Sequence, residues 1–130
     1  MSDWIWIARS VVLALHDEQI AEHGGGASLR DEGLLDSALA RPLNAAAYGN
    51  PDVAALAAAY AFGIAKNHAF VDGNKRTAAV GMELFLDLNG HELTADDGAL
   101  ALTILALADG SLDEAALAEW IRQNLRRKRR

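Results

Sequence analysis

The chain has 130 residues, of which 52% are hydrophobic and none is cysteine. This composition excludes a disordered protein, a disulfide framework and a thiolate metal site. The longest uncharged run, residues 53–65, has 13 residues, short of the roughly 20 needed to cross a bilayer. Asp3 and the lack of a basic leader argue against a signal peptide. We therefore expect one soluble domain over residues 1–130, with no membrane partner, in the reducing cytoplasm that suits a cysteine-free chain.

The net charge of −6 hides an uneven distribution. Five of the 12 basic residues are the last five, 126–130, so the other 125 residues carry 7 basic and 18 acidic groups, a net charge of −11. Such a body repels nucleic acid, whereas the basic tail could attract it. We interpret the tail as the frayed, solvated end of a helix, whose cations suit the helix dipole, and expect no direct binding to nucleic acid.

Helix is expected through most of the chain, because alanine and leucine dominate and only two prolines interrupt them. Residues 4–7 form an extended lead-in. The first helix is expected from about residue 10 to residue 23, and the glycines at 24–26 end it. The second is expected over residues 31–40, because Pro42 should prevent its continuation.

The second half of the chain predicts four more helices. One opens at Pro51 and Asp52 and reaches residue 66, and another runs from about residue 74 to residue 89. Residues 94–97 and 111–114 fit the capping-box pattern and should begin the last two helices. No segment alternates with period two for long enough to predict a strand. The predicted fold is an all-α, single-domain bundle of about six helices.

The helix expected after residue 74 is apolar on nearly every side. Between residues 77 and 88 its only charged residues are Glu83 and Asp87, which lie on one face. A helix of this kind lies in the middle of a bundle. We therefore predict a central buried helix whose N-terminus emerges from a rigid core.

A cluster of polar residues interrupts the apolar sequence just before that helix, in the stretch NHAFVDGNKRTAAV at residues 67–80. The first turn of a helix presents free N–H groups and the positive end of the dipole. Gly73 lets the backbone approach a ligand closely, and Lys75 and Arg76 add two positive charges. This combination predicts a binding site for an anion, most simply phosphate.

The remaining polar residues of the cluster suggest a reaction on that phosphate. Asp72 is unexpected in an anion site unless it holds a cation, and one carboxylate plus substrate phosphates is a usual way to bind Mg²⁺. His68 can exchange a proton near neutral pH. Asn74 can donate to a phosphoryl oxygen through its amide. The set indicates phosphoryl or nucleotidyl transfer.

Each of these residues also has a purely structural interpretation. His68 could cap the preceding helix, and Asp72 could be the N-cap of the next one. Lys75 and Arg76 could simply be solvated, although cations in the first turn of a helix oppose the dipole. Because this interpretation leaves an unfavourable placement uncompensated, we favour a functional site.

The stretch HAFVDGNKR, residues 68–76, resembles the signature of the Fic/Doc superfamily, and more closely its death-on-curing (Doc) branch, the toxins of bacterial toxin–antitoxin pairs. The blocks LHDEQIAEHGG, RDEGLLDSALARP and FLDLNGHEL also look like Doc-family sequence. The general Fic pattern is H-P-F-x-[D/E]-G-N-G-R-x-x-R. Here Ala69 replaces the proline, Lys75 the second glycine and Ala79 the final arginine.

These departures bear on the reaction that the resemblance implies. Fic enzymes generally transfer AMP, whereas Doc-type proteins carry the Lys-Arg pair and pass on the terminal phosphate of ATP. The implied activity is therefore an ATP- and Mg²⁺-dependent protein kinase. By the same resemblance, His68 would be the base on the target hydroxyl and Asp72 the Mg²⁺ ligand. The phosphate contacts would come from Gly73, Asn74, Lys75 and Arg76, and the catalytic set would be His68, Asp72, Lys75 and Arg76.

The resemblance also implies two protein partners. One is the target, a threonine of elongation factor Tu, whose modification halts translation. The other is an antitoxin of the Phd type. Two other functions remain open: a Fic-type AMP transferase, and a non-catalytic helical module that binds the ribosome or nucleic acid through the basic tail.

Overall fold

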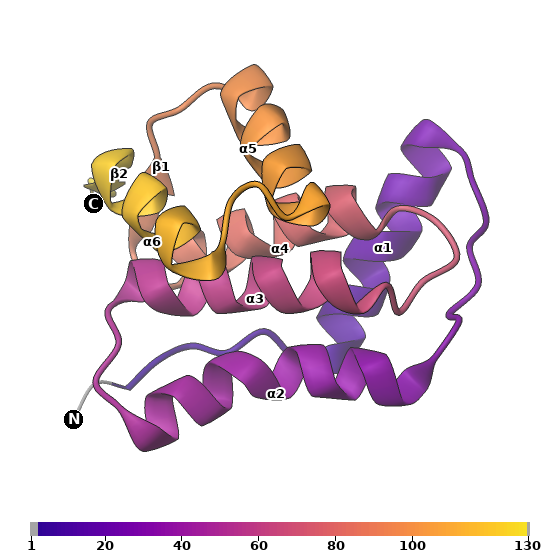
Figure 1. Ribbon diagram of the computed structural model, residues 1–130, viewed down its shortest axis with the longest axis horizontal. Helices are drawn as coiled ribbons and strands as arrows, with labels where there is room; N and C mark the ends of the chain where they lie inside the picture. Colours follow the sequence, from indigo (N-terminus) through magenta and orange to yellow (C-terminus); the bar gives the residue numbers. More distant parts are fainter. Residues whose placement is uncertain (1–2, 130) are drawn as a thin grey trace.

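Six α-helices and two short strands make up residues 3–129, the part of the chain that this computed structural model describes (Figure 1). The all-α fold predicted from the sequence is confirmed, and the extended lead-in at residues 4–7 is present. No helix in the described part of the chain is both long and apolar enough to span a membrane. The elements are α1 (Arg9–His23), α2 (Glu32–Tyr48), α3 (Val53–Asn67), α4 (Asn74–Leu88), β1 (His91–Leu93), α5 (Asp97–Asp109), α6 (Glu114–Gln123) and β2 (Leu125–Arg127).

Helices α3 and α4 form the interior of the bundle. Helix α3 packs against α2, α4, α5 and α6, and small alanine side chains on all its faces let these neighbours approach (Figure 1). Helix α4 packs against α1, α3 and α5, as expected for an interior helix, and it buries Ala78, Met82, Phe85 and Leu86. The N-terminus of α4 therefore emerges from a close-packed core.

Helix α2 corrects one prediction, because it continues through Pro42 to Tyr48 instead of ending near residue 40. Pro42 is buried, and its ring nitrogen has no hydrogen to donate to the carbonyl of Ala38 four residues earlier. Gly63 of α3 lies against that carbonyl, and a Cβ atom at position 63 would come within 2.9 Å of the Ala38 oxygen. Close packing of α2 on α3 thus outweighs the cost of a proline inside the helix.

Aspartate side chains begin four of the six helices. Asp31, Asp52, Asp96 and Asp113 each accept a hydrogen bond from the backbone N–H three residues later, at 2.7–2.9 Å. The last two helices were predicted correctly from the capping-box pattern. Their capping side chains, however, are those of Asp96 and Asp113, so both helices begin later than the Thr94 and Ser111 of that pattern.

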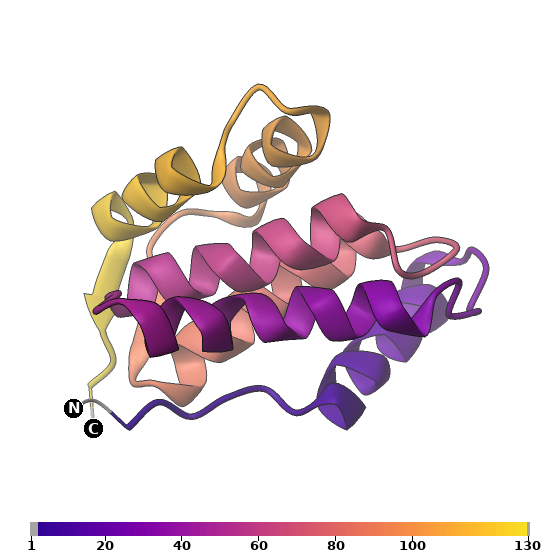
Figure 2. The same cartoon turned by 60° about the horizontal axis from the view of Figure 1, so that its bottom comes forward.

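The basic tail is ordered in a way that the sequence did not predict. Helix α6 ends at Gln123, and the chain continues into the yellow strand β2 (Figure 2), which pairs with β1 as an antiparallel two-stranded sheet. Arg126 lies opposite Glu92 and forms a 2.7 Å ion pair with it, while Lys128 pairs with Asp87 of α4. The interpretation of residues 126–130 as a frayed helix end is therefore wrong for the part that the structure describes; residue 130 lies outside it.

Candidate active site

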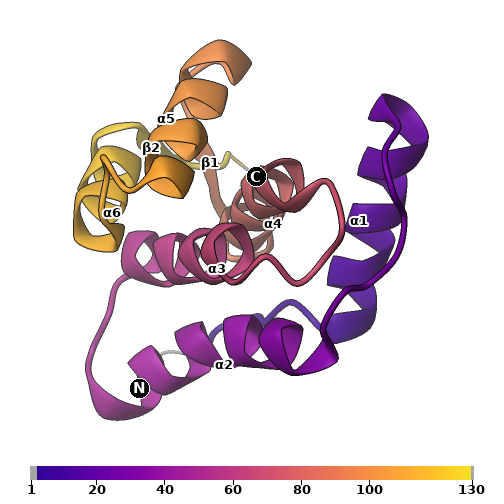
Figure 3. The same cartoon turned by 45° about the vertical axis from the view of Figure 1, so that its right-hand side comes forward.

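A cleft of about 690 Å³ lies where the end of α3 and the start of α4 face α5. Figure 3 shows how these three helices are arranged. Its α5 wall is apolar and consists of Ala101, Ile104, Leu105 and Ala108. The opposite wall carries most of the polar residues singled out in the sequence. These are His68, Asp72, Asn74, Lys75 and Arg76; Gly73, Lys66 and, one turn further along α4, Ala79 line the same wall. A cavity of this size and mixed lining suits a small organic ligand with charged groups.

His68 ends α3 and turns the chain sharply. Its φ of 56° and ψ of 49° are left-handed, and among the described residues it is the one non-glycine with a positive φ. The turn sends Ala69 and Phe70 into the core and leaves His68 exposed at the cleft. His68 is thus the C-terminal cap of α3 as well as a candidate functional residue, so the structural interpretation does not exclude the functional one.

Asn74 fixes the loop that carries His68. It is 5% exposed, its Oδ1 accepts from the N–H of Phe70 at 3.1 Å, and its Nδ2 donates to the Phe70 carbonyl at 2.9 Å. The same Nδ2 lies 3.3 Å from Nδ1 of His68. That contact is at the long end of the hydrogen-bond range, and because an amide NH₂ group can only donate, it can orient the ring only with Nδ1 of His68 as the acceptor. In the structure, the Asn74 amide contacts the backbone of Phe70 and the ring of His68. Its contact with phosphate stays a prediction.

Asp72 is held on both its side chain and its backbone. Its Oδ2 accepts from the N–H of Gly26 at 2.7 Å, and its backbone carbonyl lies 2.8 Å from Nε2 of His16. His16 is 1% exposed and stacks on the ring of Phe70 with 3.7 Å between centroids. None of the described hydrogen bonds engages Oδ1 of Asp72. The alternative interpretation of Asp72 as the N-cap of α4 is wrong, because Gly73 occupies that position.

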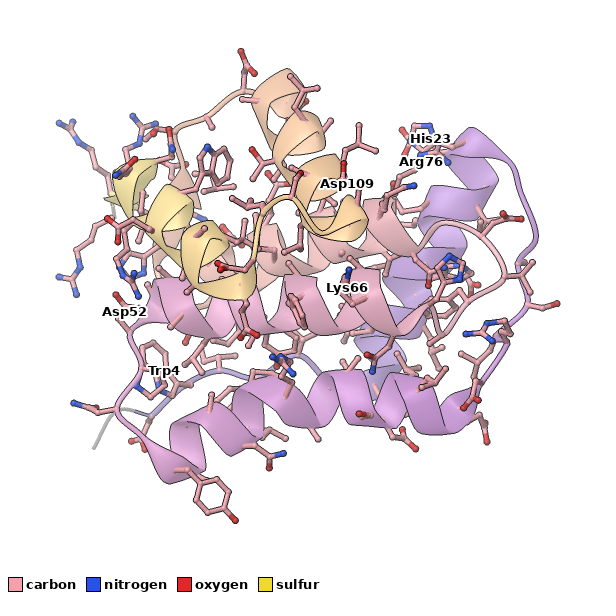
Figure 4. The ribbon with its side chains drawn as sticks, in the orientation of Figure 1. Trp4, His23, Asp52, Lys66, Arg76 and Asp109 are labelled. Carbon is pink, nitrogen blue, oxygen red and sulfur yellow. The ribbon has the colours of Figure 1, made fainter. Side chains whose placement is uncertain are left out.

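The N-terminus of α4 is open to a ligand. Gly73 precedes the helix with a φ of 79° and provides no side-chain cap for the first N–H groups. Lys75 and Arg76 are exposed in the first turn, and neither takes part in an ion pair among the described residues. Figure 4 shows Lys66 and Arg76 on the sides of α3 and α4 that face α5. Three cations and one carboxylate therefore line the cleft of an otherwise acidic protein, an arrangement that favours a polyanionic ligand.

A divalent cation fits this site only together with such a ligand. In the part of the chain that the structure describes, no group of three or more potential metal-ligating side chains exists. Asp72 nevertheless presents a carboxylate oxygen that no described hydrogen bond engages. Mg²⁺ commonly binds through one carboxylate, phosphate oxygens and water. The donor set present therefore fits Mg²⁺ bound with a nucleotide.

The α1–α2 loop, residues 24–31, contributes contacts that the sequence did not reveal. Its backbone pairs with residues 69–71: Val71 donates to the Ser28 carbonyl, and the N–H groups of Arg30 and Asp31 donate to the Ala69 carbonyl. A Cβ atom at Gly25 would lie 3.1 Å from Cβ of Asp72. The sequence did predict that these glycines end α1. One sign that these glycines also pack against Asp72 was present in the sequence, because a helix cap needs one glycine and three stand in succession at 24–26.

Fold and site together define a small helical protein in which an anion-accepting helix N-terminus adjoins a histidine and a carboxylate. The chain belongs to the Fic/DOC family, which it matches over residues 6–86. It is 50% identical over 76 residues to Toxin Doc of Mycolicibacterium smegmatis (strain ATCC 700084 / mc(2)155), a match that covers 56% of this chain and 58% of that protein. It is 31% identical over 118 residues to Protein kinase doc of Escherichia phage P1, covering 90% of this chain and 93% of that protein.

Proposed function

We propose that this protein is a Doc-type toxin that transfers the γ-phosphate of ATP to a threonine hydroxyl of a translation factor. Elongation factor Tu is the proposed target, and its modification would halt translation. One relative is named a toxin and the other a protein kinase, and these names support the two parts of the proposal. The observation that carries the choice of kinase over AMP transferase is the lining of the cleft. Lys75 and Ala79 both face it, at the positions where the AMP-transferring pattern has a glycine and an arginine.

The phosphates of ATP would lie at the N-terminus of α4. There the N–H groups of the first turn, the close backbone approach at Gly73 and the side chains of Lys75 and Arg76 offer several donors to one polyanion. Asp72 would hold Mg²⁺ together with phosphate oxygens. When bound, the cation neutralises charge that develops on the phosphates.

His68 would act as the general base. In the proposed step the hydroxyl oxygen of the target attacks the γ-phosphorus and gives its proton to the imidazole. The bond between the γ-phosphorus and the bridging oxygen breaks, and ADP leaves with the electron pair. Exposure of His68 at the cleft suits this role, because both the nucleotide and the target must reach the ring.

A toxin of this kind needs a neutralising partner, and we propose a small antitoxin of the Phd type in the same cytoplasm. The negative charge of the body would favour basic segments of such a partner. The non-catalytic alternative, a module that binds through its basic tail, is less favoured. Arg126 and Lys128 are already paired with Glu92 and Asp87, so fewer tail cations are free for nucleic acid.

Position-specific labelling tests the proposal. Purified protein is incubated with Mg²⁺, a bacterial extract and ATP labelled on either the γ- or the α-phosphate, and His68→Ala serves as the inactive control. Label on one protein from γ-labelled ATP alone indicates phosphorylation, and the mass of that protein tests elongation factor Tu. Label from α-labelled ATP alone would show AMP transfer instead. Label from neither, with toxicity retained in cells, would favour the tail-binding module.

A further inference from the structure

The side chain of Arg30 holds the carbonyl group of His68. Its Nε and Nη2 donate to the His68 oxygen at 2.8 and 2.6 Å. We infer that Arg30 is a positioning residue, which keeps His68 in its left-handed conformation and so aims the imidazole into the cleft. This inference rests on the proposed function in so far as His68 is the base.

His68 needs such support because its backbone conformation is unfavourable. A left-handed conformation costs a non-glycine residue roughly 1–2 kcal/mol, so the residue adopts it only where its surroundings hold it there. The ψ angle of His68 sets the direction of its carbonyl group. A group that binds this carbonyl therefore opposes rotation out of the left-handed region.

Arg30 is suited to this task by its own fixed backbone. Its N–H donates to the carbonyl of Ala69 at 2.7 Å, and the preceding residue, Leu29, pairs with Phe70 in an isolated β-bridge. The guanidinium thus reaches His68 from a segment that is already docked on the next two residues. Two donors of one planar group converge on a single oxygen, which restricts the direction of the carbonyl more than one donor would.

The contact comes from a different part of the chain than the motif itself. Arg30 and His68 are 38 positions apart, and Arg30 does not line the cleft. It acts on the base through the backbone and touches no reacting atom. A substitution should therefore change the rate of the chemical step more than the binding of ATP.

The test compares Arg30→Met, which keeps the length of the side chain but has no donor, with Arg30→Lys, which keeps a charged donor. The control is Arg9→Met, which removes an exposed arginine paired with Asp36 and Glu32 away from the cleft. Two properties are measured on the full chain. The backbone ¹³C chemical shifts of His68 report its conformation without nucleotide, and kcat and KM for ATP report phosphate transfer.

We expect Arg30→Met to move the backbone ¹³C chemical shifts of His68 away from the values typical of a left-handed conformation. It should also lower kcat by about 100-fold, with KM for ATP nearly unchanged. Arg30→Lys should restore the His68 chemical shifts and kcat in part, and Arg9→Met should match the wild type in both properties. Unchanged His68 shifts in Arg30→Met would overturn the inference, whatever the rate. So would changed shifts with an undiminished kcat. If the wild type transfers no phosphate, the proposed function fails, and the shifts alone decide whether Arg30 holds His68.

Discussion

Two protein contacts fix Asp72 and leave its Oδ1 without a described hydrogen bond. The backbone N–H of Gly26 donates to Oδ2 of Asp72, and the imidazole of His16 contacts the backbone carbonyl of Asp72. An amide oxygen could also accept from Gly26, and the His16 contact is to the backbone carbonyl of Asp72. The orientation of the side chain and its proposed role with Mg²⁺ can therefore be tested separately.

Asp72→Asn should separate orientation from charge. The new side chain can still accept from Gly26, so the fold and the free energy of unfolding should hardly change. Loss of the negative charge should lower phosphate transfer by about 100-fold or more at every pH, as for other electrostatic groups at a reaction centre. Transfer is measured with γ-labelled ATP over a range of Mg²⁺ concentrations, beside an unfolding curve. Full activity of the variant would refute the assignment of Asp72 to the metal.

The residue scale also shows how far the sequence could predict the site. His68, Asp72, Lys75 and Arg76 fall within nine positions, and the spacing alone indicated one helix end with an anion site. The structure brings these residues to one cleft. Asn74 holds part of the loop from within the motif. The contacts from His16, Gly26 and Arg30 could not be predicted, because a pattern of neighbouring residues does not report which distant segments pack together.

At the scale of the elements, local signals predicted helices well and tertiary contacts explain the errors. Helices α1, α3 and α4 begin and end within about one residue of expectation. A glycine or aspartate marks one end of each locally, namely Gly24 after α1, Asp52 before α3 and Gly73 before α4. Helix α2 is longer than predicted because packing on α3 tolerates Pro42. The strands β1 and β2 have three residues each, too few for a period-two pattern, and they form only because distant segments pair.

The close contact between α2 and α3 makes a specific prediction at Gly63. A Cβ atom there would lie 2.9 Å from the Ala38 carbonyl oxygen and 3.0 Å from its Cα atom. Gly63→Ala should therefore force the helices apart and lower the free energy of unfolding by about 1–3 kcal/mol. Urea denaturation monitored by circular dichroism measures this change.

Gly81 provides the matched control in helix α4. A Cβ atom there would meet Cδ1 of Ile64 at 3.5 Å, an ordinary contact. Gly81→Ala should leave stability unchanged or raise it by up to about 1 kcal/mol, because alanine favours the helix. If the two substitutions changed the free energy of unfolding equally, the close approach of α2 and α3 at Gly63 would not explain the effect of Gly63→Ala.

At the scale of the whole molecule, an ion pair ties the start of α3 to α6. Arg122 donates to both carboxylate oxygens of Asp52, at 2.6 and 3.0 Å. The hydrogen bonds from Arg122 are the main cause that lowers the pKa of Asp52 from its ordinary value of 3.8. A carboxyl group whose pKa is lower in the folded state stabilises the fold above its ordinary pKa. That stabilisation is lost as the pH falls through the folded-state value.

Asp52→Asn should reveal this pH dependence, because asparagine keeps the N-cap of α3 and removes the ion pair. We expect the variant to be less stable than the wild type by about 0.2–1 kcal/mol at pH 7, the usual range for an exposed pair. The difference should shrink as the pH falls past 3.8 and below. In an Arg122→Gln background, where the ion pair is already absent, Asp52→Asn should show a weaker trend. A difference that is constant with pH would contradict the role of the pair.

The central claim about the whole molecule is that the N-terminus of α4 holds the phosphates of ATP beside His68. Its most direct test follows the backbone amide signals of the protein by ¹H–¹⁵N NMR as Mg²⁺ and ATP are added, with AMP as the control that lacks the β- and γ-phosphates. We predict that the amides of residues 73–76 and that of His68 shift most with ATP and less with AMP. Shifts confined to residues 125–129, or to a surface away from the cleft, would contradict the account.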